Sequence, residues 1–266
     1  MTPRIAVIGD IMVDIDLHCV CERICQEGPW PVLRVERTES RPGGAGNVAA
    51  MCRALGCEST LLGFGEPSIK RRFFVDGKLT GPRIDLDQRK VATENDVDQW
   101  LRAIRIFTPD AIIVADHGKG VVGESLMRGL SQLAVPILVD PIASTPIIAP
   151  VECICGGSRE IPAEAPQPEI LIEKRGPGGL RWRLDEKWTC VPSTVSNAVD
   201  ALGAGDQFIA ALAWRRCLGD TWAEAITIAN SASGIQCQRR GCVPVAPSDL
   251  QIGIVAGNTL WNVCAD

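Results

Sequence analysis

Residues 197–214 read Asn-Ala-Val-Asp-Ala-Leu-Gly-Ala-Gly-Asp-Gln-Phe-Ile-Ala-Ala-Leu-Ala-Trp, and the prediction of the whole fold starts from this stretch. A turn that contains two glycines leads into a segment whose apolar residues Phe208, Ile209 and Leu212 recur at helical spacing. Glycine has no Cβ, so a ligand can approach the backbone N–H groups closely. The unpaired N–H groups and the dipole of a helix start favour an anion. The stretch therefore predicts an anion-binding turn.

Asp206 lies at the start of the predicted helix, where an acidic side chain ordinarily serves as a cap. A carboxylate inside an anion-binding turn also suits phosphoryl transfer, in which backbone donors hold the phosphate and Asp206 accepts the proton of the acceptor hydroxyl. A lone Gly-x-Gly-Asp is more often a helix cap. Evidence from the rest of the chain is needed to choose between a helix cap and a carboxylate that takes part in phosphoryl transfer.

Length and composition limit the fold classes and functions that are possible. A chain of 266 residues with 46% hydrophobic content suits one large α/β domain, or one domain with a small appendage. The net charge of −5 argues against a nucleic-acid-binding surface. The apolar runs fall short of transmembrane length, and residues 1–4 lead into a predicted strand rather than a signal peptide. We therefore expect a cytoplasmic protein without nucleic-acid or membrane partners.

Twelve cysteines raise the question of zinc or disulfides. They form no Cys-x-x-Cys pair, and the two histidines, His18 and His117, lie far apart in sequence. Structural zinc sites usually have closer, paired ligands. Free and mostly buried thiols in a reducing compartment are the expected state, with zinc as the lesser alternative.

Buried strands alternate with helices along the chain. Residues 4–10 form an apolar run that reaches a glycine at its end, as strands of parallel sheets do. This alternation predicts a doubly wound parallel sheet, an α/β fold. The other predicted elements are strands at 111–115, 136–140 and 169–173, helices near 48–55, 94–107, between 120 and 136, and 221–238, a loop at 141–168 and an edge strand at 241–245.

Polar residues gather where these strands end. Asp14 and Asp16 follow the first strand, at the edge where open α/β sheets bind ligands, although a turn residue is the preferred interpretation of Asp16. Residues 41–47 are a glycine turn that opens a helix, and Asn47 is either the cap of that helix or an amide that binds a hydroxyl group. The loops 116–120 and 174–179 follow two further strands.

Two segments lie outside this alternation. Residues 30–39 alternate apolar and polar side chains, which predicts a half-exposed antiparallel strand in a flap. Residues 69–87 resemble a hairpin with Asp76-Gly77 as its turn, and its basic start is expected to be a solvated edge.

Two separated motifs now carry a family resemblance. Gly43-Gly-Ala-Gly-Asn47 and Asp200-Ala-Leu-Gly-Ala-Gly-Asp206 resemble the ribokinase-like (PfkB) carbohydrate kinases, with matching order and spacing along nearly the whole chain. Residues 7–14, 22–31, 35–44, 116–120 and 229–235 look most like the D-glycero-beta-D-manno-heptose-7-phosphate kinase branch of ADP-heptose biosynthesis. The resemblance implies a three-layer αβα sandwich over residues 1–266, with a mainly parallel sheet and a small β-strand lid from about 15–39 and 69–86.

The resemblance also implies an activity. The expected reaction is ATP-dependent phosphorylation of a sugar or sugar phosphate, heptose 7-phosphate to heptose 1,7-bisphosphate, with Mg²⁺ and a homodimer formed through the lid. The implied site residues are the base Asp206 with the anion hole Gly203, Ala204 and Gly205; Asp14, Gly44, Asn47 and Lys119 for the sugar; Lys174, Gly176, Gly179 and Asn230 for the nucleotide; and Glu160 for the metal.

The chain departs from the family pattern in several places. Ala201 replaces a usual threonine, Ile142 replaces a common lysine, and the Asn-x-x-Glu metal motif is reduced to Gly-Ser-Arg-Glu at 157–160. The stretches 65–70 and 140–169 are much shorter than usual. Another sugar or nucleoside kinase, or a non-catalytic binding protein on the same scaffold, therefore remain alternatives. A Rossmann-type oxidoreductase is disfavoured, because no Gly-x-Gly-x-x-Gly follows the first strand.

Overall fold

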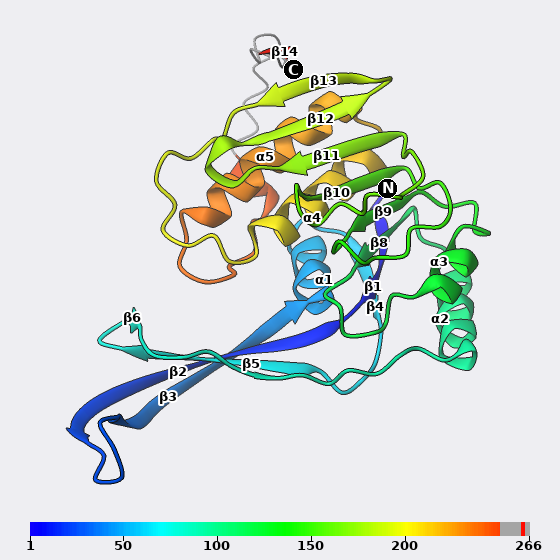
Figure 1. Ribbon diagram of the computed structural model, residues 1–266. Helices are drawn as coiled ribbons and strands as arrows, with labels where there is room; N and C mark the ends of the chain where they lie inside the picture. Colours follow the sequence, from blue (N-terminus) through cyan, green and yellow to red (C-terminus); the bar gives the residue numbers. More distant parts are fainter. Residues whose placement is uncertain (251–261, 264–266) are drawn as a thin grey trace.

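The computed structural model describes residues 1–250 and 262–263, which form two sheets and the helices around them (Figure 1). The helices are α1 (Ala45–Ala54), α2 (Glu94–Phe107), α3 (Glu124–Leu130), α4 (Ala204–Cys217) and α5 (Trp222–Cys237), with short 3-10 turns η1 (Gly176–Gly178) and η2 (Pro247–Leu250). The strands are β1 (Arg4–Gly9), β2 (Ile11–Ile24), β3 (Pro31–Gly44), β4 (Glu58–Leu62), β5 (Ser68–Val75), β6 (Lys78–Leu79), β7 (Ile84–Leu86), β8 (Ala111–Ala115), β9 (Ile137–Asp140), β10 (Cys153–Gly157), β11 (Ile170–Lys174), β12 (Leu180–Leu184), β13 (Lys187–Val191) and β14 (Asn262–Val263).

The large sheet has the strand order β14-β13-β12-β11-β10-β9-β8-β1-β4. The neighbouring pairs from β4 to β11 are parallel, whereas β12 and β13 add an antiparallel hairpin at the other side. In β1, which lies between β8 and β4, Ile5 and Val7 pack on one face of the sheet, and Ala6 and Ile8 pack on the other. Both faces are therefore covered, which explains the continuous apolar run.

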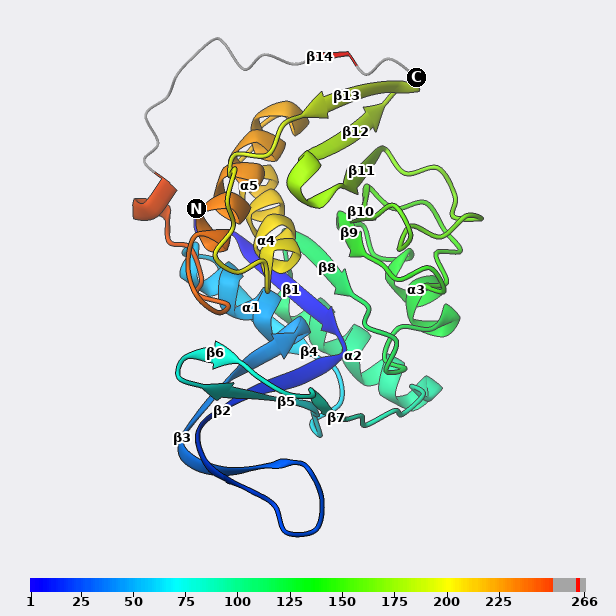
Figure 2. The same ribbon diagram turned by 60° about the vertical axis from the view of Figure 1, so that its left-hand side comes forward.

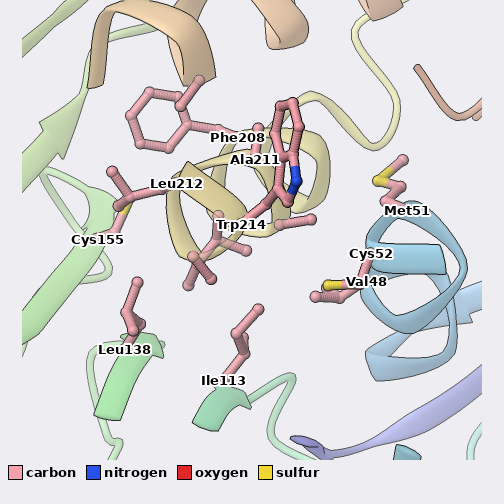
Figure 3. Packing of buried hydrophobic residues seen from close by; sticks show 14 of the residues in the cluster. Val48, Met51, Cys52, Ile113, Leu138, Cys155, Phe208, Ala211, Leu212 and Trp214 are labelled. Carbon is pink, nitrogen blue, oxygen red and sulfur yellow. The ribbon is translucent and has the colours of Figure 1, made fainter. Parts of the chain in front are cut away.

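Helices cover the two faces unequally. Helices α1, α4 and α5 lie on one face, and α2 and α3 lie on the other, so the molecule has three layers (Figures 1 and 2). Figure 3 shows α4 beside α1, with the apolar side chains of both helices and of the neighbouring strands turned toward one another. The predicted doubly wound α/β fold is confirmed.

Local capping signals explain where two helices begin. The hydroxyl of Thr93 accepts a hydrogen bond from the N–H of Asp96, whose carboxylate binds back to Thr93, and Thr221 with Glu224 repeats this capping box at α5. The predicted helices 94–107 and 221–238 therefore agree with α2 and α5 to within a residue at each end.

A small five-stranded sheet projects from the body below β1 and β4 (Figure 1). It has the order β3-β2-β5-β6, and β7 pairs with β5. Two expectations are wrong here. Asp16 is no turn residue, because it lies buried within β2, and Arg72 is no solvated edge charge, because it is 7% exposed inside the central strand β5.

Two other expectations also need correction. Residues 241–245 form no strand; the N–H of Val245 binds the side chain of Gln207 instead of a neighbouring strand. The stretch 141–168 is not all loop, because β10 crosses it in the middle of the sheet.

Ten cysteines are free thiols, as expected; Cys190 is not among them, and Cys264 lies outside the described residues. Within the described part of the chain, no helix has the length and apolarity needed to span a membrane.

Candidate active site

The turn before α4 packs tightly against two other elements. Gly203 is the N-cap of α4 with φ of 75°, and a Cβ there would lie 3.0 Å from Nδ2 of Asn47. A Cβ on Gly205 would lie 3.1 Å from Nζ of Lys174. Glycine at these two positions therefore lets the turn approach both side chains.

Asp206 does not cap α4. It lies in the first turn, and no side chain among the described residues caps this helix. The Asp206 Oδ2 instead accepts a hydrogen bond of 2.7 Å from Nδ2 of Asn47. Burial of the carboxyl group raises the pKa of Asp206, and this effect outweighs the opposing influence of His117 and of the Asn47 hydrogen bond. The carboxylate is thus held in place and is a stronger proton acceptor than an exposed aspartate.

Asn47 reaches Asp206 because of how α1 begins. The N-cap of α1 is Gly44 with φ of 54°, and a Cβ there would lie 2.4 Å from the carbonyl oxygen of Asp10. Asn47 is buried in the first turn of α1, and its amide is not a cap. Two motifs that lie 159 residues apart in the chain are thereby joined by one hydrogen bond.

Lys174 and Asp140 form a second polar pair beside the turn. They end β11 and β9, the two strands that flank β10, and Nζ of Lys174 lies 2.8 Å from Oδ1 of Asp140. Burial alone disfavours the ammonium group, but the carboxylate of Asp140 outweighs it and raises the pKa of Lys174. Lys174 therefore stays charged next to Gly205.

A pocket of about 410 Å³ opens between β11, the turn before α4 and α5. It gathers all four residues predicted for the nucleotide, the predicted metal ligand and two of the three residues predicted for the anion hole. Its walls include Lys174, Gly176, Gly179, Asn230, Glu160, Ala204 and Gly205, together with Ser193, Thr194, Val195 and Gly234. The size suits a drug-sized or nucleotide ligand.

The wall of this pocket is fixed by backbone contacts. A Cβ on Gly179 would lie 2.1 Å from the carbonyl oxygen of Val191, so glycine is required there. Nδ2 of Asn230 donates to the carbonyl oxygen of Pro192 at 2.9 Å, and the hydroxyl of Thr194 donates to the carbonyl oxygen of Asn230. Asn230 therefore shapes the wall by holding residues 192–194.

Glu160 is the acidic group of the pocket wall. Its Oε2 accepts a hydrogen bond of 2.6 Å from the N–H of Gly157, which leaves Oε1 for another partner. Among the described residues, no three His, Cys, Asp or Glu side chains gather as a metal cage. Mg²⁺ needs none, because it is usually held by one or two carboxylates, phosphate oxygens and water. A single carboxylate in a nucleotide-sized pocket fits that ion.

Asp14 and Lys119 lie on the side of the small sheet and do not line the pocket. Asp14 forms an ion pair with Arg72 at 3.1 Å, and its carboxylate lies 3.4 Å from a Cβ built on Gly43. Nζ of Lys119 lies 2.6 Å from Oδ2 of Asp87. The structure therefore separates the residues predicted for the acceptor from those predicted for the nucleotide, with Asn47 and Asp206 between the two groups.

Sequence reasoning missed Asp10 and Asp140. The buried carboxylate of Asp10 accepts hydrogen bonds from the N–H groups of His117, Lys119 and Val121, so it holds the loop after β8. Asp10 and Asp140 are each the last residue of a predicted strand. The rule that singled out Asp14 would have found them, because carboxyl ends of parallel strands meet at one edge of the sheet.

Part of the chain matches the sequence model of a known protein family. Residues 161–249 match the family described as pfkB family carbohydrate kinase. The bifunctional protein HldE of Aeromonas hydrophila subsp. hydrophila is 28% identical over 299 residues; the alignment covers 93% of this chain and 62% of that protein, so the chain spans about three fifths of the relative.

Solved structures share the fold at low sequence identity. Phosphofructokinase-2 from Escherichia coli, in complex with potassium, has a TM-score of 0.71 and 16% identity, with 94% of this chain and 97% of that chain covered. Ribokinase from Arabidopsis thaliana, complexed with ribose and ATP, has a TM-score of 0.66 and 16% identity, with 94% and 98% covered. The fold is therefore ribokinase-like.

Proposed function

The chain carries a pfkB carbohydrate kinase domain, and we propose that it transfers the γ-phosphate of ATP to a hydroxyl group of a sugar or sugar phosphate. The observation that carries the proposal is the hydrogen bond between Asn47 and Asp206, at the junction of the pocket with the acceptor side. A buried carboxylate with a raised pKa, beside a glycine turn, is arranged for proton abstraction during phosphoryl transfer.

Each group has one task in this proposal. Asp206 accepts the proton of the acceptor hydroxyl while that oxygen attacks the γ-phosphorus. The N–H groups of Gly203 and Gly205, at the start of α4, would face the developing negative charge, whereas that of Ala204 donates to the carbonyl oxygen of Ala201. Lys174, kept charged by Asp140, adds a cation beside Gly205. Asn47 keeps the carboxylate of Asp206 in position for the hydroxyl.

Mg²⁺ bound to the triphosphate would offset the charge that develops during transfer. Glu160 would hold this ion through its Oε1 or through water, because its Oε2 is already hydrogen-bonded to Gly157. The remaining ligands would be phosphate oxygens and water molecules.

The acceptor that we favour is heptose 7-phosphate, which would become heptose 1,7-bisphosphate. The support is electrostatic: Asp87 is surrounded by Lys119, Arg89 and Lys70, which together lower its pKa. Three cations around one carboxylate leave a net positive charge next to the loop that Asp10 holds. A phosphate group on the sugar would be attracted to that charge.

The small sheet would serve as a lid over this acceptor. Asp14 lies at its base, where its Oδ1 is ion-paired with Arg72. The second Asp14 oxygen lies near the glycine turn that opens α1, where a sugar hydroxyl could reach it.

Initial rates of ADP release test the proposal across sugars and their phosphate esters as acceptors. Lys119→Ala should raise the KM for a phosphorylated sugar by the equivalent of about 1.5–3 kcal/mol of binding, and leave an unphosphorylated sugar unaffected. Lys187→Ala, an exposed lysine on β13, is the matched control. Equal use of both kinds of acceptor by the wild type would exclude heptose 7-phosphate. If no acceptor gives ADP release, the alternative that the chain is a non-catalytic binding protein on the kinase scaffold is supported instead.

A further inference from the structure

Two side chains join the catalytic turn to the loop that follows α5. The carboxylate of Asp200 accepts hydrogen bonds from the N–H of Leu202 at 3.0 Å and from the N–H of Gly241 at 2.9 Å. Nε2 of Gln236 donates to the carbonyl oxygen of Leu202 at 2.5 Å and to that of Gly241 at 3.1 Å. We call Asp200 and Gln236 together the turn clamp, since Asp200 binds the N–H groups, and Gln236 the carbonyl groups, of the same two residues, Leu202 and Gly241.

The amide of Gln236 is suited to donate two hydrogen bonds at this position. The residue is fully buried in the last turn of α5. Both of its neighbours are carbonyl oxygens, so only the NH₂ end of the amide can face them. Its Oε1 is buried without a hydrogen-bond partner among the described residues. A buried acceptor without a hydrogen bond lowers the stability of the fold. The amide of Gln236 is therefore better explained by the two carbonyl groups that its NH₂ group binds than by a gain in folding free energy.

The held residues lie directly before the anion hole. Leu202 precedes Gly203, the N-cap of α4, and no side chain caps that helix. The N–H groups of Val199 and Asp200 also donate to the carbonyl oxygen of Cys237, which fixes the approach to the turn from the end of α5. With these contacts in place, the direction of the N–H groups from 203 to 205 is set before any ligand binds.

We propose that Gln236, together with Asp200, is a positioning residue for phosphoryl transfer: it orients the turn 203–206 without touching the substrate. This inference rests on the proposed kinase function. Preorganised donors act because they need no rearrangement when charge develops, and a misplacement of about 1 Å can cost about 10²-fold in rate.

The other end of the clamp reaches the small sheet. Gly241 lies against Arg41 of β3, whose Nη1 would be 3.3 Å from a Cβ at that glycine. Nη1 of Arg240 donates to the carbonyl oxygen of Gly77, in the turn between β5 and β6. The loop after α5 therefore contacts both the small sheet and the catalytic turn, and the clamp keeps the two in one relative position.

The test replaces Gln236 by methionine, which keeps the length of the side chain and removes the donor. We expect kcat to fall about tenfold to a hundredfold with the KM for ATP changed less than about twofold, since the pocket walls remain. Hydrogen exchange of peptides that cover 200–206 should accelerate, while the rest of the chain exchanges as before. Gln238→Met, an exposed residue two positions later, is the matched control and should change neither quantity.

A second variant keeps the test decisive if Gln236→Met folds poorly. Asp200→Asn retains the shape and removes the charge, and should accelerate exchange in the same peptides. Combined with Gln236→Met it should add little, because both side chains hold the same two residues, Leu202 and Gly241. Unchanged kcat and exchange in an active Gln236→Met variant overturn the inference, and so does faster exchange spread over the whole chain. A wild type without kinase activity refutes the proposed function instead, and exchange alone then decides whether the clamp orders the turn.

Discussion

At the scale of single residues, the carboxylate of Asp206 lies beside a helix start yet is bound to Asn47 and not to the helix backbone. A capping role would tie this side chain to its own helix. Its actual partner comes from the other family motif, so its position serves contacts between elements. Burial of such a group disfavours its charged form, and the chain retains it despite that cost.

This cost predicts how stability changes in Asp206→Asn. The folded-state pKa of Asp206 is raised above the unfolded value, so its contribution favours folding at low pH and is lost as the pH rises through the folded pKa. The asparagine variant should therefore be more stable than the wild type at pH 8 and lose this advantage near pH 3. Urea unfolding at both pH values measures the difference. Asp98→Asn, on the exposed side of α2, is the control; a variant at 206 that is less stable than the wild type at pH 8 would contradict the assignment.

Glu160 gives a second residue-scale prediction. If its carboxylate holds Mg²⁺ with the nucleotide, Glu160→Gln should raise the Mg²⁺ concentration needed for half-maximal rate, because an amide is a weaker ligand for this ion. Titration of the ADP-release rate with MgCl₂ measures the shift. Glu164→Gln, an exposed glutamate in the same loop, should leave the titration unchanged. Identical Mg²⁺ curves for Glu160→Gln and the wild type would assign Glu160 to the loop structure alone.

The sequence predicts single residues of the site better than their contacts. Asp206, Asn47 and the glycines follow from local chemistry, because glycine turns and helix starts bind anions wherever they occur. The pairing of Lys174 with Asp140 does not follow, since it depends on which strands are neighbours in the sheet. The same holds for Gln236, whose partners are brought together only when α5 packs beside the catalytic turn.

At the scale of elements, α5 forms one wall of the pocket and has little free space around it. Gly234 faces the loop 193–195, and a Cβ there would lie 2.1 Å from Oγ1 of Thr194. Because Thr194 also donates to the carbonyl oxygen of Asn230, the loop is held against the helix at this point. The pocket wall thus depends on a helix position without a side chain.

We therefore predict that Gly234→Ala weakens ATP binding. The methyl group must push Thr194 and Val195 away from α5, which displaces the pocket wall while the helix itself gains in propensity. Isothermal titration with an ATP analogue should show at least about a tenfold higher Kd, equivalent to about 1.4 kcal/mol. Gly123→Ala, with open space around its Cβ, should bind as the wild type does. A Kd for Gly234→Ala equal to that of the wild type would show that Thr194 and Val195 can move away from α5 without weakening ATP binding.

Elements with local signals are those that the sequence predicts well. The capping boxes at Thr93 and Thr221 mark α2 and α5 because both partners lie within four residues. The false strand at 241–245 has apolar residues but finds its hydrogen bonds elsewhere, with Val245 bound to Gln207 and the carbonyl of Pro244 bound to Arg239. The conformation of this segment is set by side chains outside it, which a local sequence pattern cannot reveal.

At the scale of the whole molecule, the small sheet stands away from the body (Figure 2). Projecting sheets with open edges tend to pair with another chain. Its exposed large apolar residues are Ile24, Trp30, Val35, Leu79, Ile84 and Leu86. We propose that two copies pair through this sheet as a homodimer, which would bury these residues in both.

Light scattering at micromolar concentration tests this assembly. The wild type should have the mass of a dimer, and Trp30→Asp should shift it to a monomer, because a charge replaces a side chain that is 67% exposed at the tip of the sheet. Ile106→Asp alters an apolar residue that is 83% exposed on α2 and should leave the dimer intact. A monomeric wild type would rule the dimer out.

The central claim is that Asp206 removes the proton of an acceptor hydroxyl during transfer from ATP. Acceptor-dependent ADP release by the wild type and by Asp206→Asn, with ATP affinity measured in parallel, tests it most directly. The account predicts an active wild type and a variant whose rate is lower by roughly 10²–10⁴ at nearly unchanged ATP affinity. An asparagine variant that phosphorylates the acceptor at the wild-type rate would contradict it.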